Sequence, residues 1–208
     1  MAKGYVLMAD IIRSSERNSE TLIRDFKEVI SVVKKKYSRE FLSPITITLG
    51  DEFQSIVKSL NGALDIVLFI EETIIRQNKD FKLRYVIEYG EIDTRINSKI
   101  AYEMLGTGLT SAREHLINSK KERDKRVHIY LQDTNLSFVL EGIFYATISI
   151  RDKWKSTDNY LISSFLSHRN YLKVANDLEI DRSQIWKREK TLMMKEYFAL
   201  VDSLKKIV

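Results

Sequence analysis

The sequence predicts an α+β protein in which an antiparallel sheet carries covering helices, followed by an all-α helix-turn-helix at the C-terminus. Apolar runs of strand length alternate with segments of helical period, in the order strand, helix, strand, strand, helix, strand. A further helix and strand follow, and beyond residue 131 the pattern is mainly helical. The first six elements have the order of a ferredoxin-like fold.

The predicted strands are short and rich in apolar or β-branched residues. They cover residues 5–11, 45–49, 53–57, 83–89 and 127–131. The first is apolar over almost its whole length, as expected of a strand buried on both faces. Pro44 closes the loop before the second strand, and Gly50 with Asp51 turns the chain into the third. Acidic side chains therefore lie at the tip of a predicted hairpin.

Helical periodicity is clearest after the first strand, where Ser19 is positioned to cap a helix. One stripe of that helix carries Leu22, Phe26, Val29, Ile30, Val33 and Tyr37. Two more helices are predicted near residues 60–75 and 105–116, and residues 136–154 read as a helix that packs between the sheet and the C-terminal part. We therefore expect a sheet domain (1–134), connecting helices (135–168) and a helix-turn-helix domain (169–208).

Composition excludes several classes of protein. Of the 208 residues, 44% are hydrophobic and 30% are charged, as in ordinary globular proteins. The most apolar stretch, 64–75, is interrupted by Asp65, Glu71 and Glu72 and is too short to cross a membrane. Asp10 stands where a signal peptide needs its apolar run. With no cysteine there is no disulfide framework and no thiolate zinc site, which predicts a cytoplasmic protein without contact to a membrane.

Two acidic turns are the strongest indication of chemistry. Asp10 closes the first apolar run, and Asp51 with Glu52 follows the second strand. Strand ends that present carboxylates near one another can hold a divalent ion against a nucleotide triphosphate. The alternative is that each acid serves only as a cap or turn residue. The histidines, His115, His128 and His168, have neither metal-ligand spacing nor an evident carboxylate partner.

Four segments resemble a known family in the correct order. They are YVLMADIIRSS (5–15), GDEFQ (50–54), RYVIEYGEI (84–92) and GTGLTSAR (106–113). These segments resemble the SatD family and, more distantly, the palm domain of the class III nucleotide cyclases. The resemblance covers roughly residues 4–131, and members of the SatD family tend to end in a helix-turn-helix.

The cyclase resemblance implies a metal and nucleotide site. Asp10 and Asp51 would hold two divalent ions, Mg²⁺ or Mn²⁺, that bind the triphosphate, with Glu52 beside them and a backbone carbonyl from Ile11. A second set of residues would bind phosphate: Arg13, Ser14, Ser15, Gly50 and Arg113. The implied ligand is a nucleotide or a nucleotide-derived molecule.

The departures from the cyclase pattern favour binding over cyclisation. Adenylyl cyclases place a purine-selecting lysine at the position of Ile47, which cannot hydrogen-bond a base. Their transition-state asparagine and arginine align with Thr110 and Glu114, and Arg113 is one position, about 100°, around the helix. Loss of such a donor typically lowers the rate about 10²- to 10³-fold. The resemblance to diguanylate cyclases is weaker, because Leu49 replaces their leading glycine.

The C-terminal segment predicts a helix-turn-helix over residues 170–188. Ala175 stands at the helix crossing, Asp181 or Ser183 would cap the second helix, and Glu179 replaces the usual turn glycine. Residues of the second helix that would contact DNA are Arg182, Ser183, Gln184, Lys187, Arg188 and Lys190. The alternative is a basic module that docks on proteins.

Specific reading of DNA by a single such motif would need a dimer. The apolar helix over 193–204 could form this homodimer or pack on the sheet domain. A second basic run, 120–126, reads as a solvated helix end and loop, with contact to phosphate as the alternative.

Three functions remain open from the sequence. The first is a regulator that binds a metal-nucleotide or nucleotide-derived ligand and DNA. The second is an active nucleotidyl cyclase or another phosphoryl-transfer enzyme that uses Asp10 and Asp51. The third is an interaction scaffold.

Overall fold

The computed structural model describes residues 2–122 and 124–207. Its sheet has the order β2-β3-β1-β4-β5 and consists of β1 (Ala2–Ile11), β2 (Phe41–Ile47), β3 (Glu52–Val57), β4 (Leu83–Ile92) and β5 (Val127–Tyr130). The first four strands are antiparallel neighbours in the predicted ferredoxin-like order. The prediction of an antiparallel sheet is wrong for β5, which pairs parallel to β4. The chain runs back along a helix between these two strands and so enters β5 in the direction of β4.

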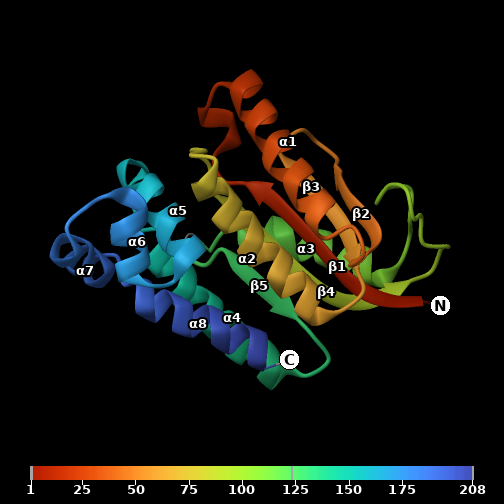
Figure 1. Ribbon diagram of the computed structural model, residues 1–208. Coiled ribbons are helices and arrows are strands. Elements are labelled where there is room, and N and C mark those ends of the chain that lie inside the picture. Colours follow the sequence, from red (N-terminus) through yellow and green to blue (C-terminus); the bar gives the residue numbers. More distant parts are fainter. Residues whose placement is uncertain (1, 123, 208) are drawn as a thin grey trace.

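Helices cover both faces of the sheet. α1 (Ser19–Lys36) and α2 (Leu60–Arg76) lie over one face, and α3 (Thr107–Ser119) lies over the other (Figure 1). Alternate residues of β1 divide between two cores: Leu7, Ala9 and Ile11 pack with α1 and α2, whereas Val6 and Met8 pack with α3. The first strand is therefore buried on both faces, as its composition predicts.

The C-terminal helices gather at one side of the sheet, on the left in Figure 1. They are α4 (Thr134–Arg151), α5 (Asn159–His168), α6 (Tyr171–Leu178), α7 (Arg182–Thr191) and α8 (Met194–Lys206), with a short 3₁₀ turn, η2 (Ser156–Asp158), between α4 and α5. Another 3₁₀ turn, η1 (Ser14–Glu16), lies between β1 and α1. α5 and α8 pack on α2, and α8 also packs on α4. In the part of the chain that the structure describes, no helix is both long and apolar enough to cross a membrane.

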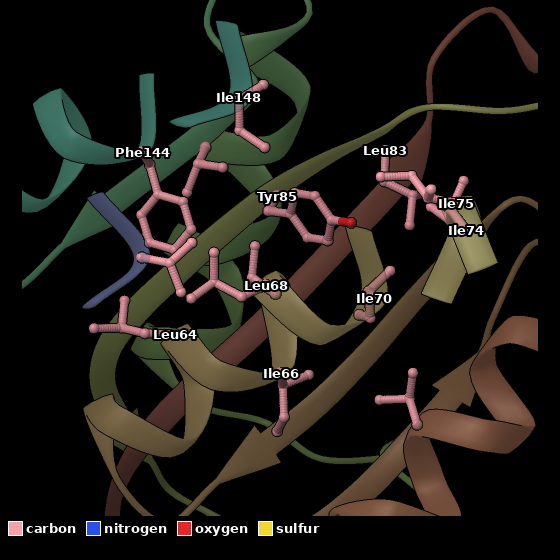
Figure 2. Close-up of a cluster of buried hydrophobic side chains, with 14 of the residues drawn as sticks. Leu64, Ile66, Leu68, Ile70, Ile74, Ile75, Leu83, Tyr85, Phe144 and Ile148 are labelled. Atoms are coloured by element: carbon pink, nitrogen blue, oxygen red, sulfur yellow. The ribbon is translucent and has the colours of Figure 1, made fainter. Parts of the chain in front are cut away.

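One hydrophobic core joins the sheet to the C-terminal helices. Figure 2 shows Leu64 and Leu68 of α2, Tyr85 of β4 and Phe144 and Ile148 of α4 as members of this core. The apolar residues of α8 belong to the same core: Met194, Tyr197, Val201 and Leu204 are almost fully buried. α8 packs on its own chain, which is one of the two roles expected for it, and the homodimer stays a prediction.

Local chemistry explains where several elements begin and end. Asn18, rather than Ser19, caps α1, and its side chain accepts a hydrogen bond from the Thr21 backbone. Pro44 lies inside β2 rather than before it, which is tolerated because β2 is an edge strand. Asp181 caps α7 by accepting from two backbone N–H groups. Glu179 takes the left-handed conformation that the usual turn glycine would adopt, with φ of 53°.

Candidate functional site

The two predicted acidic turns meet at one end of the sheet. Asp10, near the end of β1, is the cross-strand partner of Glu52, the first residue of β3. The backbone N–H of Ile11 donates to the carbonyl oxygen of Asp51 at 2.9 Å, which ties the hairpin tip to the end of β1. Gly50 makes the turn with φ of 85°, a left-handed conformation that favours glycine. The structure therefore brings Asp10, Ile11, Asp51 and Glu52 together.

Asp10 is buried, at 5% exposure, and two cations neutralise it. Nη1 of Arg84, the neighbour of Asp10 on β4, lies 3.1 and 3.2 Å from the two carboxylate oxygens. Nζ of Lys120, which follows α3, lies 3.2 Å from Oδ2. These three charged groups come from β1, β4 and the end of α3, and they form the centre of the site.

The other two acids also have partners. Nη2 of Arg113 on α3 lies 3.2 Å from Oε1 of Glu52, and the Thr48 hydroxyl also contacts this carboxylate. The Ser14 hydroxyl donates to Oδ2 of Asp51 at 2.5 Å. Asp51, Glu52 and Asp10 thus each face a donor or a cation supplied by the protein.

This arrangement does not fit a divalent ion as it stands. Among the described residues, no three His, Cys, Asp or Glu side chains are grouped so that they could hold a metal ion. A metal at Asp10 would have to share this carboxylate with Arg84 and Lys120 at close range or displace them from it. The Mg²⁺ or Mn²⁺ implied by the cyclase resemblance therefore stays a prediction.

Only some of the predicted phosphate-binding residues contact the acids of the site. Ser14 joins it through Asp51, and Arg113 joins it through Glu52. Arg13 has a left-handed backbone, with φ of 57°, and its exposed side chain lies 4.0 Å from Glu16. Ser15 is exposed on η1. The structure thus separates Arg13 and Ser15 from the cluster of acids.

Sequence reasoning missed Arg84 and Lys120. Arg84 could have been found, because a register that pairs the first and fourth strands places it beside Asp10 on the face that α3 covers. Lys120 belongs to the basic run 120–126 that was expected to be solvated, and its contact with Asp10 corrects that expectation. The signal for Lys120 is absent from the local sequence, since the contact depends on how α3 lies across the sheet.

Two histidines have carboxylate partners, contrary to expectation. Nδ1 of His115 lies 2.8 Å from Oε2 of Glu88, and the His115 ring stacks on Tyr130. Burial raises the pKa of Glu88, and the contact with His115 opposes this rise. His168 lies 3.4 Å from Asp177. These pairs hold α3 to the sheet and α5 to α6, and neither belongs to the acidic cluster.

The predicted DNA-contacting residues lie on α7 and differ in whether the protein itself already engages their side chains. Arg182, Ser183, Gln184, Lys187 and Lys190 are exposed, whereas Arg188 is drawn into an ion pair with Asp158. The Ser183 hydroxyl donates to Asp181, the cap of α7. Nζ of Lys190 lies 3.7 Å from the centre of the Trp186 ring, which is 39% exposed. Trp186 was not among the predicted residues.

Comparison with known proteins gives one family and distant structural likenesses. A bacterial light-regulated adenylyl cyclase is similar with a TM-score of 0.48 and 13% identity, over 62% of this chain and 43% of that one. This chain thus spans less than half the length of that protein. The adenylyl cyclase CyaB from P. aeruginosa is similar with a TM-score of 0.39 and 18% identity, over 56% of this chain and 71% of that one. No curated protein sequence matches. The SatD family model matches residues 5–207, nearly the whole chain, and the protein therefore belongs to the SatD family.

Proposed function

We propose that this protein is a cytoplasmic regulator that binds a nucleotide or nucleotide-derived ligand at the acidic end of its sheet and DNA through α7. The observation that carries the ligand site is the charged cluster. Three acids and three cations from β1, the β2–β3 turn, β3, β4 and α3 converge there: Asp10, Asp51, Glu52, Arg84, Arg113 and Lys120.

The cations retain donors for a ligand. Lys120 directs one contact to Asp10, and its side chain is 52% exposed. Arg113 contacts Glu52 through Nη2 alone and is also partly exposed. An ammonium group has three N–H donors and a guanidinium has five, so both side chains can contact phosphate oxygens without leaving their carboxylates. The cluster is therefore suited to the phosphate part of a nucleotide.

The surroundings of the cluster support binding rather than turnover. Thr110 and Glu114 occupy the positions of the transition-state asparagine and arginine, and both are exposed on α3. Arg113, the nearest substitute, is engaged with Glu52. The competing proposal, a metal-dependent nucleotidyl cyclase that uses Asp10 and Asp51, requires Arg113 and both acids to exchange these partners.

Ligand binding is tested by thermal unfolding with each of the four nucleoside triphosphates and their mono- and cyclic phosphates, with Mg²⁺ or Mn²⁺ and with a chelator. We expect at least one nucleotide to raise the Tm by a few degrees, because a ligand at about 100 times its Kd adds roughly 2.7 kcal/mol of stability. Asp10→Asn should lose the shift, and the exposed control Asp93→Asn should keep it.

Product analysis of the same mixtures separates the proposals. Turnover that disappears in Asp10→Ala or Asp51→Ala would establish the enzyme and contradict the regulator. Binding without turnover supports the regulator. If no nucleotide or metal changes the Tm, the ligand site is disproved and the scaffold is left.

DNA binding through α7 rests on its exposed face. Arg182, Lys187 and Lys190 form a basic surface, and the second helix of such a pair is the one that enters the major groove. Arg182→Ala with Lys187→Ala should weaken DNA binding about tenfold in a gel-shift titration. The slope of log K against log salt should fall by about 1 for each phosphate that the variant no longer neutralises.

The matched control removes two exposed lysines from α1, Lys34→Ala with Lys35→Ala, and changes the net charge by the same amount. Equal weakening in both double variants would reduce the effect to overall charge and contradict reading by α7. If α7 instead docks on a protein, the unmodified chain should show no measurable affinity for DNA.

A further inference from the structure

We propose that Arg84 and Lys120 supply the positive charge that a divalent ion would otherwise supply, so that the site takes a nucleotide with a single phosphate group in the absence of metal. This inference rests on the proposed ligand site and names its ligand class and its charge-supplying residues. It departs from the metal site that the cyclase resemblance implies.

Asp10 already has two positively charged partners in the protein. Its carboxylate is buried between Arg84 and Lys120, and the Arg84 side chain is itself only 10% exposed. A divalent ion at Asp10 would either share the carboxylate with the buried Arg84 guanidinium, which carries charge of the same sign, or displace Arg84 from it. Removing one partner of a buried ion pair is strongly unfavourable. The two resident cations therefore compete effectively with a metal ion at this carboxylate.

The net charge of the cluster limits the charge of the ligand that it can bind. The cluster holds three carboxylates and three cations, so it is neutral overall. A triphosphate would bring about four negative charges into this neutral cluster with no metal to offset them. A single phosphate brings one or two, which the remaining donors of Lys120 and Arg113 can satisfy. The charge balance favours a nucleoside monophosphate or a cyclic mononucleotide.

The cations of the cluster differ in their exposure and therefore in the roles that they can take. Lys120 and Arg113 are exposed enough to touch a ligand, at 52% and 44% of their side chains. Arg84 is buried and acts through Asp10, because it contacts both carboxylate oxygens of that residue. Arg84 is thus a positioning residue, and Lys120 and Arg113 are the residues that contact phosphate.

The experiment is isothermal titration of the full chain with mono-, cyclic and triphosphate nucleotides of each base, in EDTA and in Mg²⁺. We expect a single-phosphate nucleotide to bind with an affinity that agrees within about twofold between the two buffers. Binding that appears only with Mg²⁺, or only with a triphosphate, would overturn this inference and leave the proposed nucleotide site standing. No binding by any nucleotide in either buffer would overturn the proposed site itself.

Variants of neighbouring lysines test the assignment of Lys120. In EDTA, Lys120→Ala should bind the single-phosphate nucleotide about tenfold more weakly, the loss expected for a charge-assisted hydrogen bond. Lys121→Ala removes the same charge one residue away, on an exposed turn, and should bind like the unmodified protein. Near-UV circular dichroism confirms that both variants are folded. Equal affinity of Lys120→Ala and the unmodified chain would remove Lys120 from the site.

Discussion

Replacing Glu71 with alanine is expected to lower the free energy of unfolding by about 3 to 5 kcal/mol, because it breaks a buried ion-pair network. Glu71 lies on α2 at 1% exposure. Its carboxylate contacts both terminal nitrogens of Arg126 at 3.0 Å and Nε of Arg151 at 2.9 Å. The Tyr85 hydroxyl, visible at the centre of Figure 2, donates to it at 2.8 Å. Alanine would leave the buried Tyr85 hydroxyl without its acceptor, remove one acceptor from each terminal nitrogen of Arg126, and leave Arg151 without the opposite charge beside its Nε.

The network joins the sheet to the C-terminal helices, which is why its loss should affect the whole chain. Arg126 precedes β5, Arg151 ends α4, and Asp152 contacts both arginines from the following turn. Asp152 cannot replace Glu71, because the Tyr85 hydroxyl would still lack an acceptor. Urea unfolding at pH 7 measures the loss. Glu72→Ala, which removes a partly exposed partner of Arg76 on the same helix, is the control and should cost less than about 1 kcal/mol.

The same network predicts sensitivity to acid. Burial raises the pKa of Glu71, but Arg126, Arg151 and the Tyr85 hydrogen bond outweigh burial and lower it from 4.5 to about 2. Since the folded pKa lies below the unfolded one, this contribution, on the order of 3 kcal/mol, is complete above pH 4.5 and is lost as the pH falls towards 2. Glu71→Gln keeps the side-chain volume. The stability difference between this variant and the unmodified chain should shrink over that range, and a constant difference would contradict the assignment.

Local patterns were enough to predict the number and order of the strands, the main helices and the meeting of the acidic turns, but they placed the second strand at 45–49, whereas β2 spans Phe41–Ile47. The apolar run that ends at Asp10 and the turn at Gly50 are features of a few consecutive residues. The ferredoxin-like order then places the end of the first strand beside the start of the third, which the pairing of Asp10 with Glu52 confirms. The roles assigned to these residues in ligand and DNA binding stay predictions.

The partners of the acids could not be predicted, because they depend on contacts between distant segments. Lys120 reaches Asp10 across more than one hundred residues, and this requires the position of α3 on the sheet. Glu71 appeared only as an interruption of an apolar run, and its partners Arg126 and Arg151 lie on other elements. The direction of β5 likewise depends on the path of the chain around α3. Tertiary packing decides each of these features.

The position of α3 depends on Gly90, and Gly90→Ala is expected to destabilise the protein by about 3 kcal/mol, the upper end of the range for overpacking a core. Here the backbone of β4 meets the first turn of α3. A Cβ atom on Gly90 would lie 2.4 Å from Cα of Gly108, a distance that real Cβ atoms essentially never show. Because the obstacle is backbone and not a flexible side chain, the helix and the strand must move apart.

Gly142→Ala is the matched control, since a Cβ atom on this exposed residue of α4 would meet nothing within 4 Å. It should raise the stability by about 1 kcal/mol, the usual gain for alanine over glycine inside a helix. Urea unfolding of both variants measures the two opposite changes, and a loss below about 1 kcal/mol for Gly90→Ala would show that α3 is free to shift. Because α3 carries Arg113 and leads into Lys120, that shift should also weaken nucleotide binding. Gly142→Ala should leave nucleotide binding unchanged. A loss of both stability and binding in Gly90→Ala alone would show that the contact of Gly90 with the first turn of α3 positions the charged residues Arg113 and Lys120.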